Sequence, residues 1–272
     1  MKKILSLLVA FGMVASMTAC AAQSSSVAES TAPESEASSA SSEEAATSEA
    51  AAATAGTVLT HDEYMAADVD SEVTIETYVQ AKQSWWEDKA TVYGQSPDGA
   101  YFMYDMACSE EDYDKLTPGT CIRVTGYKSE WSGEIEIMDG TFEIVEDAEP
   151  FVAEPLDVTD LLGTDELIDH QNELVSFKGL TVEPSTVEGS DEEYAFLYNW
   201  DGSGTDGDDL YFNASYNGQT YTFTIESYLC DNTTDVYAAV KNLQVGQTID
   251  MEGFLYWYEG VNPHITSVTV AG

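Results

Sequence analysis

The chain has 272 residues and carries 50 Asp and Glu against nine Lys and Arg, a formal net charge of −41 at pH 7. So large a negative charge repels phosphate backbones, whose binding depends on Lys and Arg replacing condensed counterions. The charge balance therefore predicts that nucleic acid is not among the partners.

The first 19 residues are predicted to be an export signal. A basic start precedes an apolar stretch over residues 4–17, which is too short to span a bilayer. Cys20 follows directly after a Thr-Ala pair, and this junction resembles the lipobox of bacterial lipoproteins. The resemblance implies cleavage before Cys20, lipidation of its thiol, and anchoring on the outer face of the cell membrane. The alternative is an ordinary secretory cleavage one or two residues later, which would leave Cys20 without a role.

A tether is predicted to follow the lipidated cysteine, over residues 20–56. Beyond Cys20 this segment contains only Ala, Ser, Glu, Thr and single Gln, Val, Pro and Gly residues. Nothing in it offers apolar surface to bury, and six glutamates repel one another, so it cannot offset the entropy of ordering. We expect a disordered tether, with a helix rich in Ala and Glu as the alternative.

The remaining chain contains two copies of one unit. Residues 118–126 (PGTCIRVTG) and 245–253 (VGQTIDMEG) share the spacing of two glycines and two apolar residues. Each copy has another Gly seven residues further on, and a matching apolar segment lies upstream of each. Chance supplies one such match but hardly all of them in the same order. We predict two tandem domains, over residues 57–150 and 151–272.

Period-two alternation of β-branched and aromatic residues predicts that strands dominate both copies. In the first copy the first three strands are expected at 72–84, 89–96 and 100–108. Ser109 then caps a short helix before two further alternating segments. The second copy repeats this order, with a third strand at 221–230 and a helix near 234–243. Residues 183–209 fit no strand or helix pattern and form a long insertion after its first strand.

Five strands with one helix between the third and fourth is the order of an OB-fold, a small Greek-key barrel. The Gly-x-x-Ile-x-Val-x-Gly fourth strand and the Trp-x-Gly loop after it resemble uncharacterised OB-like domains of Gram-positive lipoproteins. The resemblance covers nearly all of 57–150 and less of 151–272. We predict a mainly β chain with two tandem five-stranded OB-like barrels. A pair of immunoglobulin-like sandwiches is the alternative.

A ligand-binding surface is predicted from the positions of the aromatic residues. OB-folds bind on the face of strands 2 and 3 and on the loops that join strands 1–2 and 4–5. All five tryptophans fall in or beside these loops, and several lysines flank those of the first copy. Aromatic faces near cations can stack sugars and pair with carboxylates. The alternative is that the tryptophans plug the barrel mouth. The candidate ligand-binding residues are Trp85, Trp86, Trp131, Lys82, Lys89, Lys128, Trp257 and Tyr258.

A second candidate is a weak calcium site in the acidic, Gly-rich segment 201–209. Carboxylate and hydroxyl oxygens on a flexible loop suit Ca²⁺, although the spacing departs from the EF-hand pattern. The alternative is a solvated turn, and no other cofactor is predicted. The candidate ligands are Asp201, Ser203, Thr205, Asp206, Asp208 and Asp209.

The cysteines offer one candidate disulfide. Cys108 and Cys230 end the third strand of their copies, which indicates a buried, small apolar position. Cys121 has no counterpart in the second copy. Because strand 3 ends and strand 4 begins at the same end of an OB barrel, a bridge between Cys108 and Cys121 is also considered.

Catalytic motifs are not found in the sequence. The three histidines are scattered, and there is no H-E-x-x-H pair, G-x-S-x-G turn or P-loop. We therefore predict a binding protein, not an enzyme. The hypothesis is a lipid-anchored extracytoplasmic protein that binds an envelope glycan or protein through loop aromatics. The alternatives are a structural or assembly lipoprotein with protein partners only, and a carboxylate-dependent hydrolase.

Overall fold

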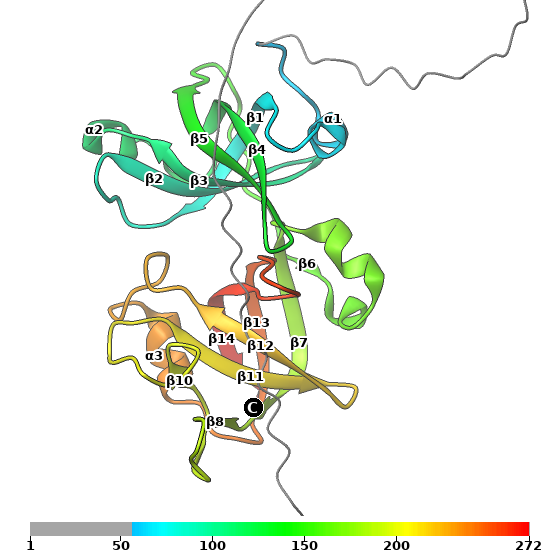
Figure 1. Ribbon diagram of the computed structural model, residues 1–272, viewed down its shortest axis with the longest axis vertical. Coiled ribbons are helices and arrows are strands. Elements are labelled where there is room, and N and C mark those ends of the chain that lie inside the picture. The colour runs from blue at the N-terminus through cyan, green and yellow to red at the C-terminus, as the bar shows by residue number, and fades with distance from the viewer. Residues whose placement is uncertain (1–55, 272) are drawn as a thin grey trace, which may run out of the picture. The chain divides into compact units, whose positions relative to one another are not determined.

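The computed structural model describes residues 56–271, and Figure 1 shows their helices and strands. The predicted signal peptide, Cys20 and almost all of the predicted tether lie outside the described residues. Within residues 56–271 the fold is mainly β. No helix in this range has the length and apolar character that crossing a membrane requires.

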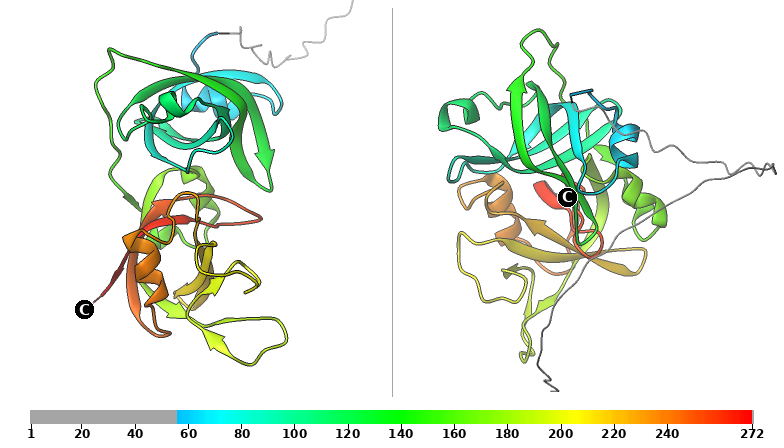
Figure 2. Two further views of the ribbon diagram at one scale, coloured as in Figure 1. Left: turned by 90° about the vertical axis from the view of Figure 1, so that its left-hand side faces the viewer. Right: turned by 45° about the horizontal axis from the view of Figure 1, so that its top comes forward.

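Five strands close the first barrel, seen as a ring of cyan to green strands in the left view of Figure 2. They are β1 (Glu72–Lys82), β2 (Lys89–Ser96), β3 (Gly99–Ala107), β4 (Cys121–Trp131) and β5 (Glu134–Ile144). Their order is β1-β2-β3-β5-β4, and β1 pairs with both β2 and β4. The sheet therefore closes on itself. Its interior is filled by fully buried side chains such as Ile75, Val92, Met103 and Val124.

A second barrel repeats this arrangement. Its strands are β7 (Leu174–Glu183), β11 (Leu210–Tyr216), β12 (Gln219–Ile225), β13 (Thr248–Phe254) and β14 (His264–Val270). β7 pairs with both β11 and β13, and the order is β7-β11-β12-β14-β13. In both barrels the third and fifth strands pair in parallel. Phe177, Phe212 and Phe223 stand at the centre of the second core.

Short helices accompany both barrels, and their ends follow the sequence signals. Thr60 and Glu63 form the reciprocal capping box of α1 (His61–Ala66). Ser109 caps α2 (Glu110–Tyr113), and Thr234 caps α3 (Asp235–Lys241). α2 and α3 lie between the third and fourth strands of their barrels.

Shorter elements lie before the second barrel and within the insertion that follows its first strand. β6 pairs with β7, β10 pairs with β11, and β8 and β9 form a separate ribbon. The bounds are β6 (Leu156–Asp157), η1 (Thr159–Leu161), η2 (Asp165–His170), β8 (Ser185–Thr186), β9 (Glu193–Tyr194) and β10 (Leu197–Tyr198).

The predicted fold class is confirmed: two five-stranded OB-like barrels, each with a short helix between strands 3 and 4. The immunoglobulin-like alternative is wrong, because each chain of strand pairings closes into one barrel instead of two facing sheets. The third strand of the second barrel ends at Ile225, earlier than predicted. Beyond it the carboxylates of Asp209 and Glu226 accept backbone N–H groups and turn the chain. The domain boundary at residue 150 stays a prediction.

The glycines that reveal the repeat lie at the same place in both barrels. Gly126 and Gly253 are paired opposite Val73 and Val175 of the first strands. Both stand where the register between the fourth and fifth strands shifts. A Cβ atom there would lie 2.8 Å and 2.3 Å, respectively, from a carbonyl oxygen of the fifth strand. A side chain would therefore force the two strands apart.

The two barrels belong to one compact unit and share an apolar contact. Tyr93 and Phe102, from strands β2 and β3, pack against Phe254 of the second barrel. The rings of Tyr93 and Phe254 stack with centroids 4.5 Å apart. The Tyr93 hydroxyl also makes a buried hydrogen bond of 2.6 Å with Nδ1 of His264. The second barrel therefore covers part of the β2–β3 face of the first barrel, on which OB-folds usually bind.

The hairpin between β4 and β5 adds polar contacts to this junction. The Glu259 N–H donates to the carbonyl of Ser132 at 2.8 Å. The Trp257 N–H donates to the carboxylate of Glu134 at 2.9 Å. Glu134 is fully buried, and its other carboxylate oxygen has no hydrogen-bond partner among the described residues. A buried, half-satisfied carboxyl group therefore stands where the barrels meet.

Candidate functional site

A cleft with a volume of about 1220 Å³ opens beside the covered face. We call it the junction cleft, because both barrels line it. Its aromatic residues come from strands and loops of both barrels, and the glutamates Glu136 and Glu226 lie among them. The principal lining residues are Trp86, Tyr104, Trp131, Glu136, Trp200, Tyr211, Glu226, Tyr228, Tyr256 and Tyr258.

A tight turn holds Trp86 at the cleft. Trp86 and Lys89 exchange backbone hydrogen bonds, and the two residues between them, Glu87 and Asp88, both have positive φ (47° and 61°). Left-handed conformation at both central residues is the signature of a type I′ hairpin turn. The Trp86 side chain is 63% exposed, so the turn presents the ring to solvent instead of burying it.

The β4–β5 hairpin presents Trp131 in the same way. Trp131 pairs with Glu134, and the intervening Ser132 and Gly133 have φ of 52° and 95°. Trp131 is 58% exposed. Two tryptophans of the first barrel therefore occupy the position directly before a turn with two left-handed residues. Exposed apolar rings held by rigid turns indicate a contact surface.

The second barrel supplies the opposite side of the cleft. Trp200 follows Asn199, a left-handed residue of the insertion, and is 73% exposed. Tyr258 lies in the β13–β14 loop, and Tyr228 follows β12; both are exposed. Trp200 and Tyr258 also line an adjoining hollow of about 720 Å³. The aromatic surface therefore continues from the junction cleft onto the second barrel.

Two glutamates, the buried Glu136 and the half-buried Glu226, contribute carboxyl groups to the cleft. Glu136 lies opposite Phe102 on the parallel β3–β5 pair and is only 5% exposed. Burial raises its pKa to about 7, and the charge of Asp105 adds to the effect. Burial likewise raises the pKa of Glu226 to about 7, with a contribution from Asp209. Both groups therefore titrate close to neutrality, where a ligand charge can shift them.

The one ammonium group in the cleft lining is already paired. Lys89 Nζ lies 2.9 Å from a carboxylate oxygen of Asp105. Asp105 has a φ of 52° at an irregularity of the β2–β3 pair, and its N–H donates to the hydroxyl of Thr91. The cleft also reaches His264, whose pKa burial lowers to about 3. His264 is therefore neutral at physiological pH.

Four of the eight predicted ligand-binding residues line the junction cleft: Trp86, Lys89, Trp131 and Tyr258. Trp85 lies half-buried, and its indole N–H donates to the Cys108 carbonyl at 2.9 Å. Trp257 is packed against the second core. The rings of Trp85 and Trp257 therefore stabilise the fold, whereas the exposed rings are accessible to a ligand.

The two other lysines serve the first barrel. Lys82 lies over the ring of Tyr113, with Nζ 3.6 Å from the ring centroid, a cation–π contact. Lys128 is only 4% exposed and donates to the carbonyls of Met65 (2.7 Å) and Ala67 (2.9 Å). It therefore satisfies carbonyls at the end of α1. Burial lowers the pKa of both lysines.

Sequence reasoning missed the tyrosines and glutamates of the cleft. Tyr104, Tyr228 and Tyr256 stand within or directly after strands, where an aromatic residue is equally typical of a core. Glu136 belongs to a regular alternation of Glu and Ile that predicts a solvent-facing acid. The structure instead buries this residue, at the edge of a cleft that both barrels line.

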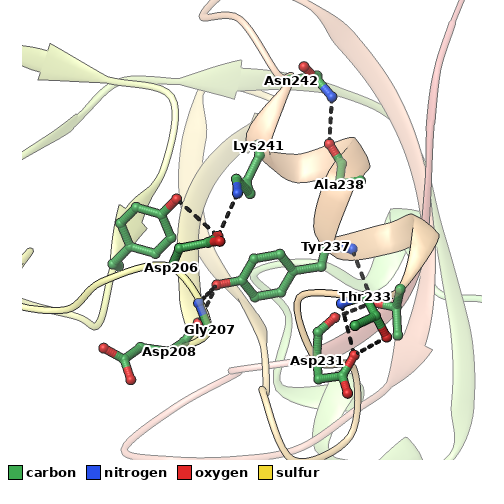
Figure 3. A network of polar contacts seen from close by, with 11 residues as sticks. Asp206, Gly207, Asp208, Asp231, Thr233, Tyr237, Ala238, Lys241 and Asn242 are labelled. Carbon is green, nitrogen blue, oxygen red and sulfur yellow. Dashed lines mark hydrogen bonds and ion pairs between the residues drawn. The ribbon is translucent and has the colours of Figure 1, made fainter.

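The acidic loop 201–209 does not gather a calcium site. Asp206 pairs with Lys241, as Figure 3 shows, and Asp201 accepts the N–H of Ser203. Asp208 accepts from Thr205, and the carboxylate of Asp209 accepts from Ser227. Across residues 56–271 no group of three or more His, Cys, Asp or Glu side chains is arranged to hold a metal ion. These contacts do not favour the calcium interpretation, because Asp206 and Asp209 are already bound to Lys241 and Ser227, outside the loop.

The described cysteines are three free, buried thiols, so the bridge considered between Cys108 and Cys121 is absent. Cys108 packs with the interior of the first barrel. Cys121 pairs opposite Tyr78 at the start of β4 and stands outside that core cluster. The two thiols therefore face different environments. Burial raises the pKa of Cys108 and of Cys230 to about 11, which keeps them protonated.

Comparison with known proteins shows the fold alone. No family model matches the chain, and no curated protein matches it. Solved structures that share the barrel architecture include an Ifi202 HINa domain in complex with double-stranded DNA (13% identity, 74% of this chain, 98% of that chain, TM-score 0.32). A murine DNA-binding protein with double-stranded DNA has 11% identity over 73% of this chain and 96% of that chain (TM-score 0.34). A replication protein A heterotrimer bound to single-stranded DNA has 12% identity over 74% of this chain and 49% of that chain (TM-score 0.31).

These structures correct the sequence-based exclusion of nucleic acid. The charge of the chain predicted that nucleic acid is not a partner, yet OB-like structures similar to this one are bound to DNA. The prediction that nucleic acid is not a partner rested on net charge alone and is wrong as an exclusion. At 10–13% identity and TM-scores of 0.30–0.34 the comparison assigns no ligand to this chain.

Proposed function

We propose that the protein is a lipid-anchored extracytoplasmic protein that binds an envelope glycan in the junction cleft. One observation carries the proposal: six exposed aromatic rings, contributed by both barrels, line a single cleft. They are 39–73% exposed and belong to Trp86, Tyr104, Trp131, Trp200, Tyr228 and Tyr258.

The chemistry of the lining supports a sugar ligand. Sugars present flat C–H faces that stack on aromatic rings, while their hydroxyl groups need a small number of polar partners. The cleft offers such partners in Gln83, Asn262 and Glu226 beside the rings. Its volume of about 1220 Å³ exceeds the ~300–1,000 Å³ of most small-molecule pockets. An oligosaccharide therefore fits it better than a single sugar.

The strand pairings also favour stacking over peptide binding. An extended peptide adds to an unpaired strand edge in one common recognition mode. The strands that contribute residues to the junction cleft are each paired on both sides: β2, β3, β4, β5, β11 and β14. A ligand in the cleft therefore meets side chains and not a free backbone edge.

The lipid anchor rests on the resemblance of the segment before Cys20 to a lipobox. Two or more acyl chains hold a protein on a membrane stably, whereas one chain is marginal. Metabolic labelling with a radioactive fatty acid, followed by membrane fractionation, tests this part. Label on the wild type and none on Cys20→Ala, with the variant released from the membrane, is the expected result. An unlabelled wild type would overturn the anchor and leave the cleft proposal unaffected.

Calorimetric titration tests the binding. The chain from residue 20, carrying Cys20→Ala, is titrated with cell-wall glycan fragments and neutral oligosaccharides. We expect saturable binding that Trp86→Ala or Trp131→Ala weakens at least about tenfold, the loss of roughly one stacked ring. Tyr127→Ala is the matched control, because Tyr127 is exposed on β4 but does not line the junction cleft.

The same titration separates the alternatives. Binding that Tyr127→Ala weakens as much as Trp86→Ala would contradict the cleft as the site. No heat with any glycan, with the fold intact by circular dichroism, would overturn the glycan proposal and favour a partner-protein role. A single-stranded oligonucleotide belongs in the panel, and tighter binding of it would replace the glycan.

A further inference from the structure

The most unusual group in the junction cleft is Glu136. Glu136 lines the cleft although it is only 5% exposed to solvent. Within the described range 56–271 its carboxyl group has neither a hydrogen-bond donor nor a cation as a partner, whereas its backbone pairs with β3 and β4. Burying a polar group without a partner is unfavourable, and such groups in folded proteins call for a specific explanation. A ligand that supplies the missing donor is such an explanation.

The charges around Glu136 indicate which donor would fit. The cleft lining contains four acidic residues, Glu87, Asp105, Glu136 and Glu226. Its lysine, Lys89, is already held by Asp105 at 2.9 Å. The lining of the cleft therefore has an excess of carboxyl groups and no ammonium group left for Glu136. A positively charged donor is the complement to this lining.

The aromatic rings point to the same ligand chemistry. Trp and Tyr faces attract ammonium groups through their quadrupoles, most strongly where water is excluded. Tyr104 and Tyr256 stand close enough to Glu136 for their pKa values to be raised in part by its charge, after the larger effect of burial. A carboxylate among aromatic rings can bind an ammonium group in two ways at once. The carboxylate accepts its hydrogen bonds, and the ring faces attract its positive charge.

We propose that the junction cleft selects a glycan with free amino groups, and that Glu136 pairs with one ammonium of an amino sugar. This inference rests on the proposed function, since it names the class of glycan. Glu226 faces the same cleft from the second barrel and already accepts the N–H of Leu229 at 2.8 Å. Glu136, which has no such partner, is therefore the principal selecting group.

The test compares two probes that differ only in the amine. A glucosamine tetramer and its fully N-acetylated counterpart are titrated into the same chain, below the pKa of the amines. We expect the amine tetramer to bind about tenfold more tightly, the effect of one hydrogen bond to a charged group. Glu136→Gln keeps the shape of the side chain and should remove most of this preference. It should leave binding of the acetylated tetramer within about twofold.

Two further variants keep the result interpretable. Glu130→Gln is the matched control, because Glu130 is an exposed acid on β4 that does not line the junction cleft and should leave the preference unchanged. If Glu136→Gln fails to fold, Glu226→Gln tests whether the acidic lining contributes to the preference for the amine tetramer. We expect Glu226→Gln to reduce this preference, but by less than Glu136→Gln.

The outcomes distinguish this inference from the proposed function. Equal affinity for the two tetramers would overturn the amine inference while glycan binding stands. No binding of either tetramer, or of the wider glycan panel, would overturn both. Tetralysine that binds more tightly than the amine tetramer, in a manner that depends on Glu136, would overturn the amino sugar and assign the ammonium to a basic peptide.

Discussion

The two barrels share a scaffold and differ in their loops. Both have the strand order 1-2-3-5-4, with a glycine at the same close approach between strands 4 and 5. Between strands 1 and 2 the first barrel has a short loop that ends in a type I′ turn, whereas the second has a long insertion with three extra strands. Yet both loops bring one exposed tryptophan, Trp86 or Trp200, to the junction cleft. The scaffold is thus repeated, while the surface of the cleft comes from the parts that diverged.

The largest effect is expected from the shared glycine. Gly253→Ala would place a Cβ atom 2.3 Å from the His264 carbonyl oxygen, so we expect a loss of roughly 3 kcal/mol or more in the free energy of unfolding. Gly126→Ala meets its neighbours at 2.7–2.8 Å and should cost less. Chemical denaturation measures both. The control is Gly179→Ala, which has open space but a φ of 70° and should cost about 1 kcal/mol. Equal losses for all three would contradict the close approach.

The stability of the contact between the two barrels should depend on pH through the carboxyl group of Glu134. Burial raises the pKa of Glu134 from its ordinary value of 4.5 to about 8, so the folded protein holds a proton that the unfolded chain releases. Its contribution to stability is therefore present in full below about pH 4.5 and is lost as pH rises through about 8.

Glu134→Gln removes this titration. Relative to the wild type, the variant should gain a few kcal/mol of stability between these two pH values, because one pKa unit corresponds to about 1.4 kcal/mol. Denaturation at a series of pH values measures the difference. Glu130→Gln, on the exposed part of the same hairpin, is the control. A constant difference between Glu134→Gln and the wild type across the series would show that Glu134 titrates normally.

Substitution of two lysines of the first barrel separates the effect of a residue that supports the fold from that of a residue at the cleft. Lys128→Met leaves two carbonyls near the end of α1 without a donor and should cost about 1–3 kcal/mol of stability. Lys89→Met breaks only an exposed ion pair with Asp105 and should cost at most about 1 kcal/mol. Thermal denaturation compares them. The reverse order of the two losses would mean that the buried contacts of Lys128 are not formed in solution.

The smallest effect is expected in the acidic loop of the second barrel. Because its carboxylates are already engaged, added calcium should leave the melting temperature unchanged relative to a chelator. Asp206→Asn weakens the exposed pair with Lys241 and should cost less than about 1 kcal/mol. Stabilisation by calcium that Asp206→Asn abolishes would restore the metal site.

The strand order could be predicted from the sequence because alternation and glycine spacing are local properties. The register glycines illustrate this, since Gly126 and Gly253 were identified by spacing and lie at equivalent positions. Half of the eight predicted ligand-binding residues also reach the cleft. Glu136 could not be identified, because local alternation predicts an exposed acid at this position, whereas the cleft that it lines is formed by residues of both barrels. Lys128 looked like a flanking surface cation, and only the position of α1 explains why it is buried.

The contact between Tyr93 and Phe254 has a consequence for how the duplicated unit is used. Both rings are almost entirely removed from solvent, and each belongs to a different copy of the repeat. A copy separated from its partner would expose an aromatic patch together with an unpaired His264 or tyrosine hydroxyl. The two copies are therefore not independent modules, and we expect the pair, and not a single barrel, to be the smallest piece of the chain that stays soluble on its own.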